Sequence, residues 1–218
     1  MKPLRKLLLL TLSIALIIFV CSCRPRSTAE VPRSVSPSYT VFVAPFTQPI
    51  VSGQLITGSI PEHQGRIVEE QLPSLDQQMR TILSTETKRL YKFITSMERP
   101  RDFTKFHNSG QPQALPLWLQ YGKKQGAHLL LVPQVLDWHE REGSGAGVIQ
   151  PAHVRVEFFL LNIDRDLVIG RSVFEETQQG LVDNLLNVGA FLHRRGQWVT
   201  AEQLCIDGIR KATRDLGL

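Results

Sequence analysis

The sequence predicts an α/β fold of the α+β type, in which helices pack on a mixed sheet that ends in an antiparallel meander. Three stretches of the C-terminal half are rich in Val, Ile, Leu and Phe and are separated by turn-forming residues, as strands are. They are Ala127–Trp138, Ala152–Ile163 and Leu167–Glu175. The first connection is rich in Gly and the second is the tight turn Asp164–Asp166, so both connections favour antiparallel hairpins.

The N-terminus has the features of a bacterial lipoprotein signal peptide. Basic residues precede the apolar run Leu7–Val20, which is shorter than the roughly 20 residues that a membrane-spanning helix needs. The segment Val20–Cys23 follows and resembles the lipobox, with an aliphatic residue at its start and a small residue directly before the acceptor Cys23. Cys21 is a less usual choice within this motif. The resemblance implies cleavage before Cys23 and acylation of its thiol and new amino group, with palmitate among the chains.

These features divide the chain into three parts. Residues 1–22 are expected to be the signal peptide, 23–38 the acylated cysteine with a flexible tether, and 39–218 a single periplasmic domain. The tether is rich in Pro and Ser and, in an extended polyproline form, reaches roughly 45 Å from the bilayer. Arg24 is not the Asp that retains many lipoproteins at the inner membrane, so we expect an outer-membrane anchor that faces the periplasm. An uncleaved anchor helix is the alternative.

Charge argues against a nucleic-acid partner. The net charge of the chain is +5, but six of the 25 Lys and Arg precede Tyr39 and only one of the 20 Asp and Glu does. The predicted domain therefore carries 19 of each, and it lacks the cationic surplus that binding to phosphates requires.

The first half of the domain alternates strands, loops and helices. Tyr39–Phe46 is apolar on both faces, as in a strand that is covered on both sides, and Thr47–Gln64 is expected to be a loop or small hairpin. Tyr91–Ser96 is expected to be a short strand and Met97–Gln113 an irregular loop. A helix is predicted to begin near Pro73. Its inward face is predicted to carry Leu75, Met79, Ile82, Leu83 and Leu90.

A second helix is predicted over Leu115–Gln125, with Leu115, Trp118 and Leu119 facing inward and Tyr121 as a further candidate for that face. Gly122 within it and Gly126 beyond it leave its end open.

The second hairpin has a predicted register in which Ile163 lies opposite Leu167. This register pairs Arg155 with Glu175, Val156 with Phe174 and Phe158 with Ser172. One face then carries Val154, Val156, Phe158 and Leu160, and the other carries Phe159, Leu161 and Ile163 with the Arg155–Glu175 pair.

Two helices are predicted at the C-terminus, the first over Leu181–Arg195. The last helix has a complete start signal, with Thr200 as N-cap, Gln203 as its capping-box partner and Val199 with Leu204 as a hydrophobic staple. Its buried stripe is predicted to contain Leu204, Cys205, Ile209, Ala212 and Leu216.

Motifs for catalysis or metal binding are incomplete throughout. Gly143–Gly147 precedes a strand where a phosphate loop needs a helix, and His139 lacks the second histidine of a zincin because Gly143 stands there. The turn from Asn162 lacks the glycine and glutamate of a calcium loop. His128 and His153 are expected to be packed or edge residues, and Cys205 a buried hydrophobic residue. We therefore expect no enzyme activity, no cofactor and no metal.

A candidate contact loop for a protein partner lies at the Gly-rich hairpin. Trp138, Glu140 and Arg141 place an aromatic side chain beside charges at the mouth of this hairpin, a composition that suits partner recognition. The alternative is that Trp138 covers the end of the sheet.

Short motifs carry a resemblance to the domain shared by the penicillin-binding-protein activator LpoB, the curli secretion lipoprotein CsgG and the TolB N-terminal domain. They are Val41–Phe46, Gly126–Leu130 and Asn162–Asp166, and the resemblance covers Tyr39–Leu218. It implies a non-enzymatic α/β module that contacts another envelope protein, and it supplies no catalytic residue. Three further segments resemble a subgroup of bacterial lipoproteins: Trp138–Ser144, Phe174–Gln178 and Trp198–Gln203.

The function expected from these features is that of an outer-membrane lipoprotein with a periplasmic protein-binding domain, which scaffolds or regulates an envelope complex in cell-wall synthesis or secretion. The alternative is a periplasmic hydrolase or small-ligand-binding protein.

Overall fold

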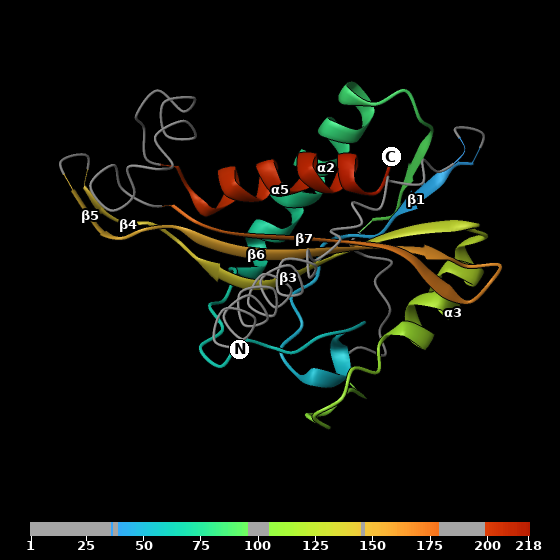
Figure 1. Ribbon diagram of the computed structural model, residues 1–218, viewed down its shortest axis with the longest axis horizontal. Coiled ribbons are helices and arrows are strands. Elements are labelled where there is room, and N and C mark those ends of the chain that lie inside the picture. Colours follow the sequence, from blue (N-terminus) through green and yellow to red (C-terminus); the bar gives the residue numbers. More distant parts are fainter. Residues whose placement is uncertain (1–35, 37–38, 96–104, 145–146, 179–198) are drawn as a thin grey trace, which may run out of the picture. The chain divides into compact units, whose positions relative to one another are not determined.

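A mixed sheet organises the domain (Figure 1). The computed structural model describes residues 36, 39–95, 105–144, 147–178 and 199–218, so the signal peptide, Cys23 and the predicted helix Leu181–Arg195 lie outside the described residues. Within them the strand order is β2-β1-β3-β6-β7, with β1 parallel to both neighbours and the last three strands antiparallel. The strands are β1 (Val41–Val43), β2 (Tyr91–Phe93), β3 (Leu129–His139), β6 (His153–Asn162) and β7 (Leu167–Thr177). The predicted α+β fold and its antiparallel meander are confirmed.

The Gly-rich connection forms a small hairpin of its own. β4 (Glu142–Ser144) and β5 (Gly147–Gln150) pair with each other as a second, two-stranded sheet. This hairpin, here called the ribbon, extends the long hairpin of β3 and β6 beyond the end of the main sheet (Figure 1).

Helices cover both faces of the main sheet (Figure 1). α2 (Leu72–Glu86) and α5 (Ala201–Asp215) lie on one face and α3 (Leu115–Gln125) lies on the other. Short 3-10 turns occupy Ser52–Gln54 and Glu69–Gln71. α3 ends at Gly126, whose left-handed backbone (φ 70°) settles the end that the sequence left open. None of the described helices combines the length and the apolar character needed to cross a bilayer.

A hydrophobic core lies on each face of the main sheet, and the side chains of β6 alternate between the two cores as predicted. Val154, Val156, Phe158 and Leu160 pack toward α2 and α5, where Phe158 meets Phe46 edge to face with 6.1 Å between ring centroids. Phe159, Leu161 and Ile163 pack on the opposite face, with Trp118 of α3.

The predicted N-cap of α5 and its predicted buried stripe are confirmed, whereas within the described residues the side chain of Gln203 makes no return bond to Thr200. The hydroxyl of Thr200 accepts a hydrogen bond from the N–H of Gln203 at 3.2 Å, and the predicted stripe from Leu204 to Leu216 is buried. At its other end Asp215 accepts hydrogen bonds from Ser172 of β7 and from Lys211. Burial acts to raise the pKa of Asp215, but these two hydrogen bonds and the nearby positive charges lower it overall.

Removing the cap of α5 should destabilise the domain. Thr200→Ala takes away the acceptor for the Gln203 N–H, and we expect the free energy of unfolding to fall by about 1 kcal/mol. Urea denaturation checks this value. Thr213→Ala is the matched control, because this hydroxyl only bonds back to the carbonyl of Ile209 and Ala favours helix. An equal loss in both variants would contradict the assigned cap.

The register of the second hairpin is correct over most of its length and wrong at its turn. Arg155 pairs with Glu175, Val156 with Phe174 and Phe158 with Ser172, as predicted. A β-bulge then shifts the register between Leu160 and Leu161, so Asn162 lies opposite Leu167, and not Ile163. The bulge places Ile169 as an extra residue on β7.

One predicted core residue is exposed. Leu90 was expected on the buried face of the first helix, but α2 ends at Glu86 and Leu90 is 72% exposed. The backbone turns extended at Thr87, whose hydroxyl caps the carbonyl of Leu83, and Leu90 then leads into β2 through the bond from the Val41 N–H to its carbonyl.

Candidate functional site

The sheet face that carries α3 has an apolar half and a polar half. Leu130, Val132, Phe159 and Leu161 belong to the apolar core beneath α3. Toward the ribbon the cross-strand partners of β3 and β6 become polar. These partners, here called the polar row, are Gln134 with Glu157, Asp137 with Arg155, and His139 with His153.

A β-bulge produces this row. The pairing of β3 with β6 shifts between Val135 and Asp137, which leaves Leu136 as the extra residue. Beyond the bulge the faces of β3 are exchanged, so Asp137 shares a face with Gln134 and Trp138 joins the core beneath α2 and α5. Strict alternation along the sequence assigns the opposite faces, which is why sequence reasoning did not single out Asp137, Gln134 or Glu157.

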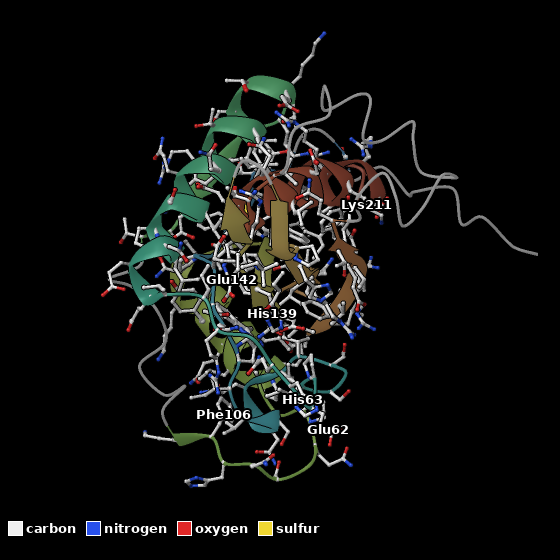
Figure 2. All side chains as sticks on the ribbon, turned by 90° about the vertical axis from the view of Figure 1, so that its left-hand side faces the viewer. Glu62, His63, Phe106, His139, Glu142 and Lys211 are labelled. Carbon is white, nitrogen blue, oxygen red and sulfur yellow. The ribbon has the colours of Figure 1, made fainter. Side chains whose placement is uncertain are left out.

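Asp137 is the centre of the row. Its Oδ1 accepts hydrogen bonds from the N–H of Gly65 at 2.6 Å and of Trp138 at 3.0 Å, and the carboxylate is nearly buried. Nε2 of His139 lies 3.1 Å from Oδ1, and Nε2 of His153 lies 3.3 Å from Oδ2. One carboxylate therefore holds two imidazoles and two backbone amides at the base of the ribbon, where Figure 2 labels His139.

Glu157 is the most deeply buried charge in the row, with no exposed surface. Arg171 of β7 donates to its Oε2 through Nη2 at 2.7 Å and through Nε at 2.9 Å. Arg155 donates to the other oxygen at 3.3 Å and lies 3.8 Å from Glu175. Two guanidinium groups thus satisfy one buried carboxylate, the pairing that burial of a charge requires.

The irregular segment from Thr47 to Ile67, here called the covering segment, lies over the row and is fixed by side-chain amides. Gln134 donates to the carbonyl of Gln54 at 3.0 Å and accepts from the N–H of Ile56 at 3.3 Å. Gln64 donates to the carbonyl of Leu136 at 2.8 Å. At Gly65 a Cβ would lie 2.1 Å from the carbonyl oxygen of Trp138, so only glycine fits this approach.

The structure buries the aromatic residue of the predicted contact loop. Trp138 is 2% exposed, and its indole N–H donates to Glu140 at 2.9 Å. This geometry fits the alternative in which Trp138 covers the end of the sheet. Glu140 is exposed and Arg141 is half-buried, so the exposed part of this loop is charged. The most exposed apolar side chain of the ribbon is Ile149, at 84%.

The other residues singled out from the sequence lie apart from the row. His128 is exposed and lies 2.9 Å from Asp164, and Oδ1 of Asn162 accepts from the N–H of Arg165 within the same turn. Cys205 is buried, and this burial, followed by the charge of Glu202, raises the pKa of its thiol. Cys23 lies outside the described residues.

The polar row contains a hydrogen-bonded series of side chains in addition to its ion pairs. No cluster of His, Cys, Asp and Glu with the arrangement of a metal site is present in the described part of the chain. Nδ1 of His153 lies 2.6 Å from the hydroxyl of Thr177, so Asp137, His153 and Thr177 form a carboxylate–imidazole–hydroxyl series.

Ser36 and the ribbon lie at opposite ends of the sheet. Arg89 donates to the carbonyls of Ser36 at 2.8 Å and of Tyr39 at 3.3 Å, which fixes the point where the predicted tether enters the domain. β1 follows at once, and Val41 pairs with Leu129 at the start of β3. The ribbon follows the other end of β3, roughly 33 Å farther along the strand at ~3.3 Å per residue.

Among known proteins, matches to this chain were found among solved structures. No family model matches the chain, and no curated protein matches it. A PelC dodecamer from Paraburkholderia phytofirmans matches at 13% identity and a TM-score of 0.47, over 84% of this chain and 90% of that chain. The lipoprotein GNA1162 from Neisseria meningitidis matches at 10% and 0.36, over 72% and 98%.

The LpoB C-terminal domain from Escherichia coli is also among the matches, as the motifs in the sequence predict. It is 10% identical, with a TM-score of 0.32, over 64% of this chain and 83% of that chain. The chain thus resembles LpoB and lipoprotein domains at low identity. At these identities and TM-scores the likeness indicates no function.

Proposed function

We propose that the protein is a lipid-anchored envelope lipoprotein of the outer membrane, whose periplasmic domain binds another envelope protein and scaffolds or regulates its complex. The observation that carries this proposal is the placement of tether and ribbon at opposite ends of β3. A domain that is held at Ser36 presents the ribbon at its far end, away from the point of attachment. Cell-wall synthesis and secretion are the processes that the resemblance to LpoB and CsgG favours.

The ribbon has the properties of a contact surface. β4 and β5 pair only with each other among the described residues, so each presents an outward edge to which a partner strand can add. Ile149 and Glu142 are exposed on it, and Figure 2 labels Glu142 at this end of the domain. Asp137 contacts His139 and His153, the residues of β3 and β6 that flank the ribbon, so the polar row fixes the strand ends from which the ribbon projects.

A change at the ribbon should remove the partner without unfolding the domain. We expect Ile149→Asp to lower the recovery of the specific partner from detergent-solubilised membranes by about tenfold, since it places a charge on a side chain that the partner would bury. Co-purification with mass spectrometry measures the recovery. Ile50→Asp makes the same change at a half-exposed side chain outside the ribbon, and equal recovery from both variants would argue against the ribbon.

A periplasmic hydrolase is the second candidate, and the series Asp137–His153–Thr177 favours it. In a serine-type triad, however, Nε2 of the imidazole faces the nucleophile and Nδ1 faces the carboxylate. Here Nε2 faces Asp137 and Nδ1 faces Thr177. His153 and Thr177 are also direct cross-strand partners, a usual place for a hydrogen-bonded pair. We therefore propose a structural role for the series.

Hydrolysis of a p-nitrophenyl ester separates these two candidates. We expect the full chain and its His153→Ala variant to give the same rate, equal to that of buffer, because the series lacks the orientation for proton transfer. A rate well above buffer that falls by about 10³-fold in His153→Ala would instead support the hydrolase.

A further inference from the structure

Exposed apolar side chains gather at the end of the sheet where the tether enters. The registers place one row of residues across this end: Tyr91, Val41, Leu129, Asn162 and Leu167. Seven large hydrophobic side chains are exposed in the described part of the chain, and four of them lie on or beside this row. They are Tyr39 (50%), Leu90 (72%), Leu167 (41%) and Ile169 (44%), here called the rim.

Positive charge surrounds the rim. Lys88 and Lys92 flank Leu90 in sequence and are exposed. The last turn of α3 reaches the same end, since Lys123 lies 2.7 Å from Asp166 in the turn between β6 and β7. That region adds two further exposed basic side chains, those of Lys124 and Arg165.

The acidic residues at this end of the sheet each form an ion pair or a hydrogen bond with a basic side chain. Asp166 is paired with Lys123, Asp164 lies 2.9 Å from Nδ1 of His128, and Glu86 accepts from Arg210 at 3.0 Å. The surface around Tyr39 and Leu90 therefore combines apolar side chains with a surplus of positive charge, as the membrane-facing side of a peripheral protein does.

Arg89 fixes the tether inside the rim. Its guanidinium binds the carbonyls of Ser36 and Tyr39, and it also donates to the carbonyl of Gly217 at 3.5 Å. Ser36, the first described residue, is therefore held beside Tyr39 by Arg89, which directly precedes Leu90 in the chain. Fully extended, a tether from Cys23 to Ser36 would span about 40 Å, so the lipid anchor raises the effective concentration of the bilayer at the rim and a weak affinity for lipid is enough for contact.

We propose that the rim contacts the surface of the anionic bilayer to which Cys23 anchors the chain. The inference rests on the proposed function, because it requires the lipid anchor. Tyr39 and Leu90 enter the headgroup region, and Lys88 and Lys92 meet anionic headgroups. With the rim on the membrane, β3 leads away from the bilayer and carries the ribbon toward partners in the periplasm (Figure 1).

Fluorescence quenching on the lipidated full chain tests this inference. Leu90→Cys and Ile149→Cys each receive an environment-sensitive dye, since Cys205 is buried and Cys23 is acylated. Each is reconstituted in vesicles of equal parts phosphatidylglycerol and phosphatidylcholine that contain lipid-borne quenchers. We expect several-fold stronger quenching at position 90 than at position 149. Lys88→Glu with Lys92→Glu, or omission of phosphatidylglycerol, should reduce it.

Equal quenching at the two positions, or none at position 90, would overturn the proposed contact. A flotation assay on the same samples keeps this failure apart from failure of the anchor. A chain that floats with the vesicles but is not quenched at position 90 is anchored without a docked rim. A chain that does not float contradicts the lipoprotein assignment itself.

Discussion

Cys23→Ser is expected to abolish delivery of the protein to the outer membrane and to leave a precursor that retains residues 1–22. The thiol of Cys23 is the predicted acceptor of the first acyl chain, and without it neither acylation nor cleavage before this residue takes place. Stable anchoring needs at least two lipid signals, so the loss should be close to complete. Intact-mass spectrometry and separation of the two membranes measure both effects.

Cys21→Ser is the matched control for this prediction. It removes a thiol two residues away but leaves the acceptor, so the processed mass and the outer-membrane fraction should not change. If Cys21→Ser and Cys23→Ser had exchanged effects, the cleavage point would be misplaced. An unchanged mass in both variants would favour the uncleaved anchor helix.

Arg171→Met should cause the largest loss of stability among the substitutions considered for the polar row. It removes both hydrogen bonds to Oε2 of Glu157 and leaves this fully buried carboxylate with Arg155 alone, at 3.3 Å. Breaking a buried ion pair costs about 3–5 kcal/mol. Because Arg171 is 39% exposed, water screens part of the interaction, and we expect a loss of about 2 kcal/mol in urea denaturation.

A second substitution distinguishes the buried charge from lost packing. In Glu157→Leu with Arg171→Met neither charge is present, and we expect the double variant to recover most of the stability that Arg171→Met loses. Arg165→Met on the exposed turn is the control and should stay within about 0.5 kcal/mol of the parent. If Arg171→Met behaves like this control, the Glu157 pair does not stabilise the domain.

The sequence predicted those strands and helix ends that depend only on residues close together in the chain. The composition of β3, β6 and β7 and the capping residues around Thr200 identify strands and a helix start without reference to the rest of the chain. The second hairpin was predicted in register as far as Leu160, because its faces alternate regularly up to that residue.

The features that the sequence did not predict depend mainly on contacts between residues that are distant in the chain. The bulge at Leu136 exchanges the faces of β3, and it is held by the pairing with β6 and by the covering segment, which is remote in sequence. The polar row therefore could not be derived from periodicity. A usable signal was present in Arg155 and Glu157, two charges inside an otherwise apolar strand. Leu90 was misassigned because helical spacing continues past Glu86, where the backbone turns extended.

In the proposed function, the ribbon meets another envelope protein at the end of the sheet opposite Ser36. The most direct measurement is photocrosslinking in living cells, with a photoreactive amino acid at Ile149 of the lipidated full chain and, as control, at Lys211 on α5 (Figure 2). We predict a discrete adduct with one envelope protein at position 149 and none at position 211. No adduct at position 149, or the same adducts at both positions, would contradict the claim.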